Sequence, residues 1–251
     1  MSNQVHDCCT PHTIGSAGLA PERASPRVRE ALCAIENAGA LVSWHGLTAE
    51  EDRVRVTLLR MYAESGRAPS IADLARQVEM NLQELEALLA NLQSRDVIVR
   101  DTNSGAIIAA YPFAEGDTGY QVDLGAQTLR AMCAIDALGI GAMFERDVCI
   151  RSSCSLCGTS IEVATLNRGK ELAYWTPETV IVWSGIRYED GCAANSLCKV
   201  LAFFCSDAHL ASWRHTQTDG APGFRLSMEE GLEAGRALFE DSLKRLTGPR
   251  P

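Results

Sequence analysis

The spacing of apolar residues changes from helix-like to strand-like near the middle of this 251-residue chain. In the first half, apolar positions recur every three or four residues within segments that start at capping residues. In the second half, short β-rich runs alternate with turn residues, and such short spacing favours antiparallel pairing. We therefore predict an α+β fold, with a helical N-terminal region followed by a mostly antiparallel β-sheet flanked by helices.

The first half contains three helix starts and one hairpin. Capping boxes at Thr48–Glu51 and Asn81–Glu84 each predict a helix start, Ser70 begins a shorter helix between them, and Gly66 ends the first helix. The sequence VIVR, the turn-forming DTNSG and the apolar IIAAY then predict a β-hairpin. Three helices followed by a hairpin resemble a winged helix. We assign this region to 26–119, after a flexible N-terminal tail at 1–25.

The second half, 120–251, is predicted to be a second domain with a helix at about 126–140. Ser206 is expected to cap a short helix through Trp213, and Ser227 with Glu230 a final one. The apolar residues of that final helix are Leu232, Phe239, Leu243 and Leu246. The predicted strands are 147–151, 160–166, 178–185 and 199–206, with turns at 167–169 and 190–191.

Composition excludes some classes of protein and disfavours others. A net charge of −9 repels nucleic acid, so we expect no nucleic-acid partner. No apolar run is long enough to span a membrane, and the first residues lack the pattern of a signal peptide, so we expect a cytoplasmic protein without a membrane partner. In that compartment the ten cysteines should be free thiols rather than disulfides.

The segment RAMCAIDALGI carries a polar residue where apolar ones are expected. If it is helical, Cys133 and Asp136 project from one face, together with Leu129 and Ile140. Burial of a carboxylate is costly and raises its pKa, which suits a group that exchanges protons near neutral pH. The alternative is a structural role for Asp136, in a buried hydrogen bond or a backbone kink.

Three further cysteines stand in informative contexts. Cys198 introduces an apolar strand beside a turn-rich segment, where a side chain is held firmly yet within reach of a ligand, although a packed thiol is the alternative. Cys154 and Cys157 have C-x-x-C spacing, which fits a structural zinc site or a thiol oxidoreductase. A zinc site needs two more ligands, for which Cys192 and Cys198 are candidates.

The stretches TLRAMCAIDALGIGAMF, RSSCSLCGTSIEV and NSLCKVLAFF resemble organomercurial (alkylmercury) lyases in order and spacing. The resemblance covers roughly 30–246 and is strongest from 120 to 215, which implies that 120–251 is the catalytic domain. It implies that Cys133, Asp136 and Cys198 form the active site and hold the mercury of substrate and product. Cys154 matches a family cysteine usually treated as structural, whereas Cys157 has no obvious counterpart.

The activity implied by this resemblance is the cleavage of carbon–mercury bonds by protonolysis. Soft thiolates bind mercury in preference to carboxylates or amines, and a second thiolate supplies electron density to the carbon. No resident cofactor is expected. Exogenous thiols would be needed for turnover, and small thiols or a mercuric reductase would accept the inorganic mercury(II).

Two alternatives stay open at this point. A winged-helix regulator could sense a metal or oxidant through its cysteines, although the predicted helix near 81–94 contains no Lys or Arg to meet phosphates. The N-terminal residues His6, Cys8, Cys9 and His12 either gather mercury for the site or are incidental to an unstructured tail.

Overall fold

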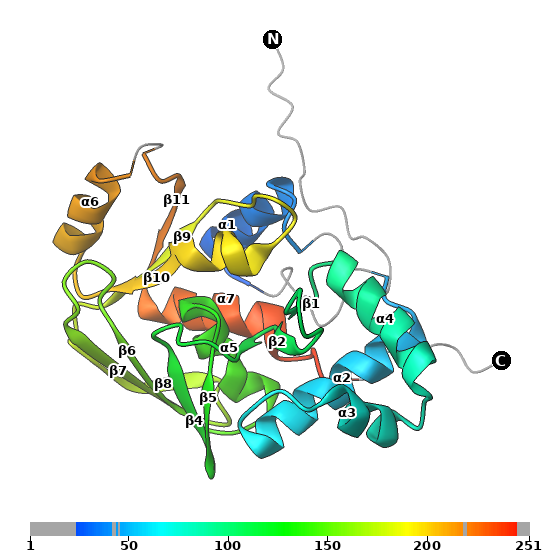
Figure 1. Cartoon of the computed structure of the whole chain (residues 1–251). Helices are drawn as coiled ribbons and strands as arrows, with labels where there is room; N and C mark the ends of the chain where they lie inside the picture. The colour runs from blue at the N-terminus through cyan, green and yellow to red at the C-terminus, as the bar shows by residue number, and fades with distance from the viewer. Residues whose placement is uncertain (1–23, 42–43, 45, 218–219, 245–251) are drawn as a thin grey trace.

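The computed structural model describes residues 24–41, 44, 46–217 and 220–244, which form a mixed α+β fold. Figure 1 shows α2, α3 and α4 together at one side of the molecule, α5 and α7 in its middle, and α6 at the opposite side. The helices are α1 (Pro26–Asn37), α2 (Ala49–Ser65), α3 (Ile71–Val78), α4 (Leu82–Ser94), α5 (Ala134–Met143), α6 (Asp207–His215) and α7 (Met228–Phe239). Among these described helices, none has the length and apolar character needed to cross a bilayer.

The strands form three antiparallel sheets, with orders β1-β2-β3, β10-β9-β11 and β5-β4-β6-β7-β8. The first sheet consists of β1 (Ile98–Arg100), β2 (Ile107–Ala110) and β3 (Phe113–Ala114). The second consists of β9 (Ile181–Gly185), β10 (Leu201–Phe204) and β11 (Gly223–Leu226). The largest consists of β4 (Gln121–Leu124), β5 (Gln127–Arg130), β6 (Cys149–Ser153), β7 (Ser160–Leu166) and β8 (Glu171–Thr176).

The predicted helix starts in the N-terminal half are confirmed. Thr48 and Asn81 form capping boxes with Glu51 and Glu84, and Ser70 caps α3 through the amide of Asp73. The hairpin after α4 is also confirmed, with β1 and β2 antiparallel. Its description as a winged helix stays a prediction.

The predicted helix at about 126–140 is wrong in its first half. Residues Gln127–Arg130 form β5, paired with β4 through a tight turn at Gly125, and the helix begins only at Ala134. Leu129 is therefore not on the helix face assigned to it. The apolar spacing of a short segment fits a strand and a helix alike, and here pairing with β4 decides for the strand.

The helices and strands near the C-terminus follow the predicted order, with some differences. The capping box of Ser227 and Glu230 starts α7 as predicted, but the helix ends at Phe239, before Leu243. Leu246 lies outside the described residues, as do 1–23 with the His and Cys residues of the predicted tail. Helix α1 and strands β3, β4, β8 and β11 were not predicted from the sequence.

Helix α5 is the centre of the fold, because all ten of its residues are buried. It packs against α7 at a point where both helices carry glycine. A Cβ atom added to Gly139 would lie 2.6 Å from the Gly235 carbonyl oxygen, and one added to Gly235 would lie 2.7 Å from the Gly139 nitrogen. These glycines let two backbones approach closely and thereby fix the position of the α5 N-terminus. The buried apolar residues from both halves of the chain form one continuous core, and the boundary near 119–120 stays a prediction.

Candidate active site

Cys133 is the N-cap residue of α5 and lies at the junction between β5 and that helix. Its extended backbone directs the side chain back over the first turn, where the amide of Asp136 donates a hydrogen bond to Cys133 Sγ at 3.4 Å. Sulfur here occupies the place that a serine or threonine oxygen takes in an ordinary cap. The three-residue spacing that the sequence revealed therefore reflects an N-cap and its third helical residue, rather than two residues inside a helix.

Asp136 brings the two predicted cysteines together. The Cys133 thiol donates to Asp136 Oδ2 at 3.0 Å, and Cys198 Sγ lies 4.0 Å from the same oxygen. The two sulfur atoms and the carboxylate oxygen all lie within 4.8 Å of one another. The tertiary structure thus brings together Cys133 and Cys198, which are 65 positions apart in the sequence.

The site is buried, which changes the proton affinity of its carboxyl group. Cys133, Asp136 and Cys198 are 0%, 5% and 8% exposed. Burial raises the pKa of Asp136 to about 7, and the hydrogen bond from Cys133 lowers it by less. At neutral pH this carboxyl group is therefore balanced between holding and releasing a proton.

Both thiols favour their neutral form. Burial, followed by the hydrogen bond with Cys198 and the charge of Asp136, raises the pKa of Cys133 well above its usual value. For Cys198, the hydrogen bond with Cys133 lowers the pKa, but burial together with the charges of Asp136, Asp96 and Cys192 raises it by more. A thiolate therefore forms in this site only when a neighbouring base takes the proton or a bound metal displaces it.

Cys198 lies in a short 3-10 turn, Leu197–Val200, that leads directly into β10. The loop before this turn is held by a buried carboxylate from the end of α4. Asp96 accepts hydrogen bonds from Tyr111 Oη at 3.0 Å, Tyr188 Oη at 3.2 Å and the Ala193 amide at 2.8 Å. The N-terminal helical region thereby fixes the segment that carries the second cysteine.

A second group of soft ligands lies elsewhere in the fold. Cys154 and Cys157 meet Cys205 and His209, and the four ligand atoms lie within 4.8 Å of one another. The prediction that Cys192 and Cys198 complete this set is wrong, because Cys198 lies in the group with Cys133 and Asp136. The missed signal is the C-x-x-x-H spacing of CSDAH, which crosses the junction between β10 and α6.

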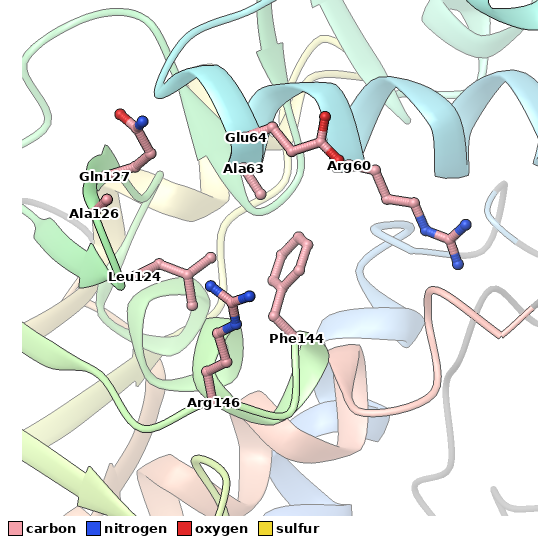
Figure 2. A pocket seen from close by; sticks show the side chains of 8 residues that line it. All are labelled: Arg60, Ala63, Glu64, Leu124, Ala126, Gln127, Phe144 and Arg146. Carbon is pink, nitrogen blue, oxygen red and sulfur yellow. The ribbon is translucent and has the colours of Figure 1, made fainter.

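A cavity of about 300 Å³ lies between α2, the β4–β5 turn and the C-terminal end of α5. Figure 2 shows Ala63 and Glu64 of α2 on one side of it, with Phe144 and Arg146 on the other. Phe144 is the C-cap of α5, whereas Cys133 is its N-cap, so the cavity lies roughly 15 Å along the helix from the cysteine. It is therefore separate from the site of the two thiols.

An α+β fold that buries two thiols against a proton-exchanging carboxyl group places the chain among proteins suited to soft metal ions. Thiolates select such metals, and the carboxyl group adds acid–base chemistry at the metal.

Comparisons with known proteins narrow this class. Residues 113–240, just over half of the chain, match the family model described as "MerB: Alkylmercury lyase". Alkylmercury lyases of Staphylococcus epidermidis and Bacillus cereus are each 25% identical to this chain over 74% of its length, covering 82% and 81% of those proteins. The crystal structure of the mercury-bound form of MerB2 matches with a TM-score of 0.67 and 26% identity, over 88% of this chain and 100% of that one. The chain belongs to the alkylmercury lyase family of enzymes, and the resemblance stated from the sequence is confirmed.

Proposed function

We propose that the protein cleaves organomercurials by protonolysis at Cys133, Asp136 and Cys198, giving a hydrocarbon and inorganic mercury(II). The observation that carries this proposal is the convergence of two buried sulfurs and one carboxylate oxygen within 4.8 Å. The membership of the chain in a family of alkylmercury lyases supports the choice of substrate class.

Capture of the substrate is a thiol exchange. One cysteine of the site binds the mercury of the substrate and releases the thiol previously bound to it, which leaves with the proton of that cysteine. The carboxylate of Asp136 then takes the proton of the second cysteine, whose sulfur also binds the metal. The thiol of Cys133 already donates to this carboxylate at 3.0 Å, so a path for one of these protons exists before substrate arrives.

Cleavage returns the proton to carbon. With two thiolates on the metal, the electron pair of the carbon–mercury bond becomes basic enough to take the proton of Asp136, and the hydrocarbon leaves. Mercury(II) stays on the two sulfurs and the carboxylate is restored. A carboxyl group with a pKa near 7 suits both halves of this transfer, because neither gain nor loss of the proton is strongly uphill at neutral pH.

Entry of substrate and exit of product are expected to involve the segment before Cys198, because Cys198 is the most exposed of the three residues. We propose that small thiols, or the cysteines of a mercuric reductase, remove the product by further exchange. A reducing compartment such as the cytoplasm would keep these thiols available.

The test is benzene release from phenylmercury by purified protein with excess small thiol. We expect wild-type protein to release benzene, and Cys133→Ser and Cys198→Ser to release almost none, because a single thiolate on the metal does not make the carbon basic enough to take a proton. Asp136→Ala should lower kcat/KM by about 10²- to 10⁴-fold, the usual contribution of a general acid or base.

Cys149→Ser is the matched control. Cys149 lies on β6, is only partly buried and belongs to neither group of clustered ligands, so its substitution should leave benzene release unchanged. Thermal unfolding of each variant would show that loss of activity does not come from loss of fold. Full activity in either Cys133→Ser or Cys198→Ser would contradict the assignment of that residue.

A further inference from the structure

The group formed by Cys154, Cys157, Cys205 and His209 offers three sulfurs and one imidazole from separate segments of the chain. Cys154 and Cys157 come from the turn between β6 and β7, Cys205 directly follows β10, and His209 lies in the first turn of α6. None of these residues takes part in the proposed cleavage of the carbon–mercury bond.

The distances in this group match the edges of a tetrahedron around one metal ion. Zinc–sulfur bonds of about 2.3 Å and zinc–nitrogen bonds of about 2.0 Å place ligand atoms roughly 3.5 to 3.8 Å apart. In the structure, Cys157 Sγ lies 3.7 Å from Cys205 Sγ, and Cys154 Sγ lies 3.7 Å from His209 Nδ1. Cys205 Sγ and His209 Nδ1 are closer, at 3.0 Å. A small outward shift of these two atoms would admit the ion.

The backbone around the group holds its ligands in place. The Gly158 amide donates to the Cys154 carbonyl at 2.9 Å and closes the C-x-x-C turn, with Gly158 in the left-handed region at φ 71°. The Ser155 amide donates to the Phe203 carbonyl at 3.0 Å, which brings the turn against the end of β10. Two sheets and α6 thus meet at the four ligands, as expected of a site that stabilises a fold.

We propose that these four residues form a structural zinc site of the Cys₃His type. Three thiolates and one imidazole are soft and borderline ligands that suit zinc, and a complete set of four protein ligands leaves no open position for a substrate. The site would join the β6–β7 turn to the end of the strand that follows Cys198, and it would therefore support the active site without entering its chemistry.

The test is the zinc content of full-length protein purified with a phosphine reductant from cells supplied with zinc. We expect wild-type protein to contain about one zinc ion per chain. In Cys157→Ser and in His209→Ala the zinc content should fall by at least about tenfold. Cobalt(II) bound in place of zinc should show the visible absorption of a tetrahedral ion with thiolate ligands, and this spectrum should be lost or changed in both variants.

Matched controls separate this site from the proposed active site. Cys149→Ser and the double variant Cys133→Ser/Cys198→Ser should keep the zinc ion, whether or not the protein releases benzene. The proposal would be overturned by wild-type protein that binds neither zinc nor cobalt. It would equally be overturned by zinc that persists in both Cys157→Ser and His209→Ala, or by a ligand group that takes up mercury(II) but not zinc.

Discussion

Asp136 lies in the first turn of a helix whose ten residues are all buried, and its proton affinity follows from that position. The residue keeps a carboxyl group in an apolar setting, where its charged form is poorly solvated. Because the pKa of Asp136 is raised to about 7, the carboxyl group gains and loses its proton in the neutral pH range in which the enzyme would work. The same environment that would make Asp136 a proton carrier therefore also destabilises the folded protein when the group is ionised.

The pH dependence of stability tests this environment directly. The folded chain keeps the proton of Asp136 up to about pH 7, whereas the unfolded chain loses it near pH 4. The contribution of Asp136 to stability therefore falls as pH rises from about 4 to about 7, and it is constant above that range. Asp136→Asn removes this dependence. We expect the stability of Asp136→Asn relative to wild type to increase by about 1 to 3 kcal/mol between pH 5 and pH 8 in urea unfolding.

Asp123 provides the matched control for this measurement. A hydrogen bond from Arg151 holds the pKa of Asp123 below its usual value, so this group is ionised at both pH values. The stability difference between wild type and Asp123→Asn should therefore be the same at pH 5 and pH 8. An equally constant difference for Asp136→Asn would show that Asp136 does not bind its proton unusually tightly in the folded protein.

At the scale of elements, the structure connects the end of α4 to the loop that precedes Cys198. Asp96 is almost fully buried and accepts three hydrogen bonds, two from tyrosine hydroxyls and one from the amide of Ala193. Burial raises its pKa, while the three donors lower it by a smaller amount. The helical region thus has a structural link to the loop that precedes Cys198.

Asp96→Ala should loosen this loop, because three donors lose their acceptor and an unpaired buried donor costs about 1 to 3 kcal/mol. We expect faster alkylation of Cys198, followed by peptide mass spectrometry, and a lower rate of benzene release. Asp101→Ala serves as control, since Asp101 accepts hydrogen bonds only within the exposed turn of the β1–β2 hairpin. Unchanged alkylation of Cys198 in Asp96→Ala would argue against the link.

At the scale of the whole molecule, the net charge of −9 bears on the regulator alternative. The helix α4, which would face DNA in a winged-helix regulator of the kind considered, contains no Lys or Arg within Leu82–Ser94. A duplex that met α4 would therefore find no cationic side chain on that helix to offset the repulsion.

Fluorescence anisotropy with labelled DNA at low salt should accordingly show no sequence-specific binding. Phenylmercury should not create it, because α4 offers no Lys or Arg to phosphates whether or not the metal is bound. Tight binding that distinguishes one DNA sequence from another would restore the regulator alternative. Competition with unlabelled DNA of unrelated sequence provides the control.

Several parts of this protein are determined by local sequence. Helix starts at Thr48, Asn81 and Ser227 are confirmed because a capping box satisfies backbone amides within four residues, whatever surrounds it. The predicted bounds of the strand Ser160–Leu166 are also confirmed, because neighbouring turn residues and β-branched residues within the segment itself determine them. The resemblance to alkylmercury lyases was also visible in sequence, through the order of its cysteine motifs.

Only the tertiary structure decided which distant residues meet. Residues Gln127–Arg130 became a strand through pairing with β4, and Cys133 consequently became a helix cap rather than a helical residue. The partners of Cys154 and Cys157 proved to be Cys205 and His209 instead of Cys192 and Cys198. Local spacing limits the conformations of a segment, but the distance between segments depends on the packing of the whole core, to which residues from both halves of the chain contribute.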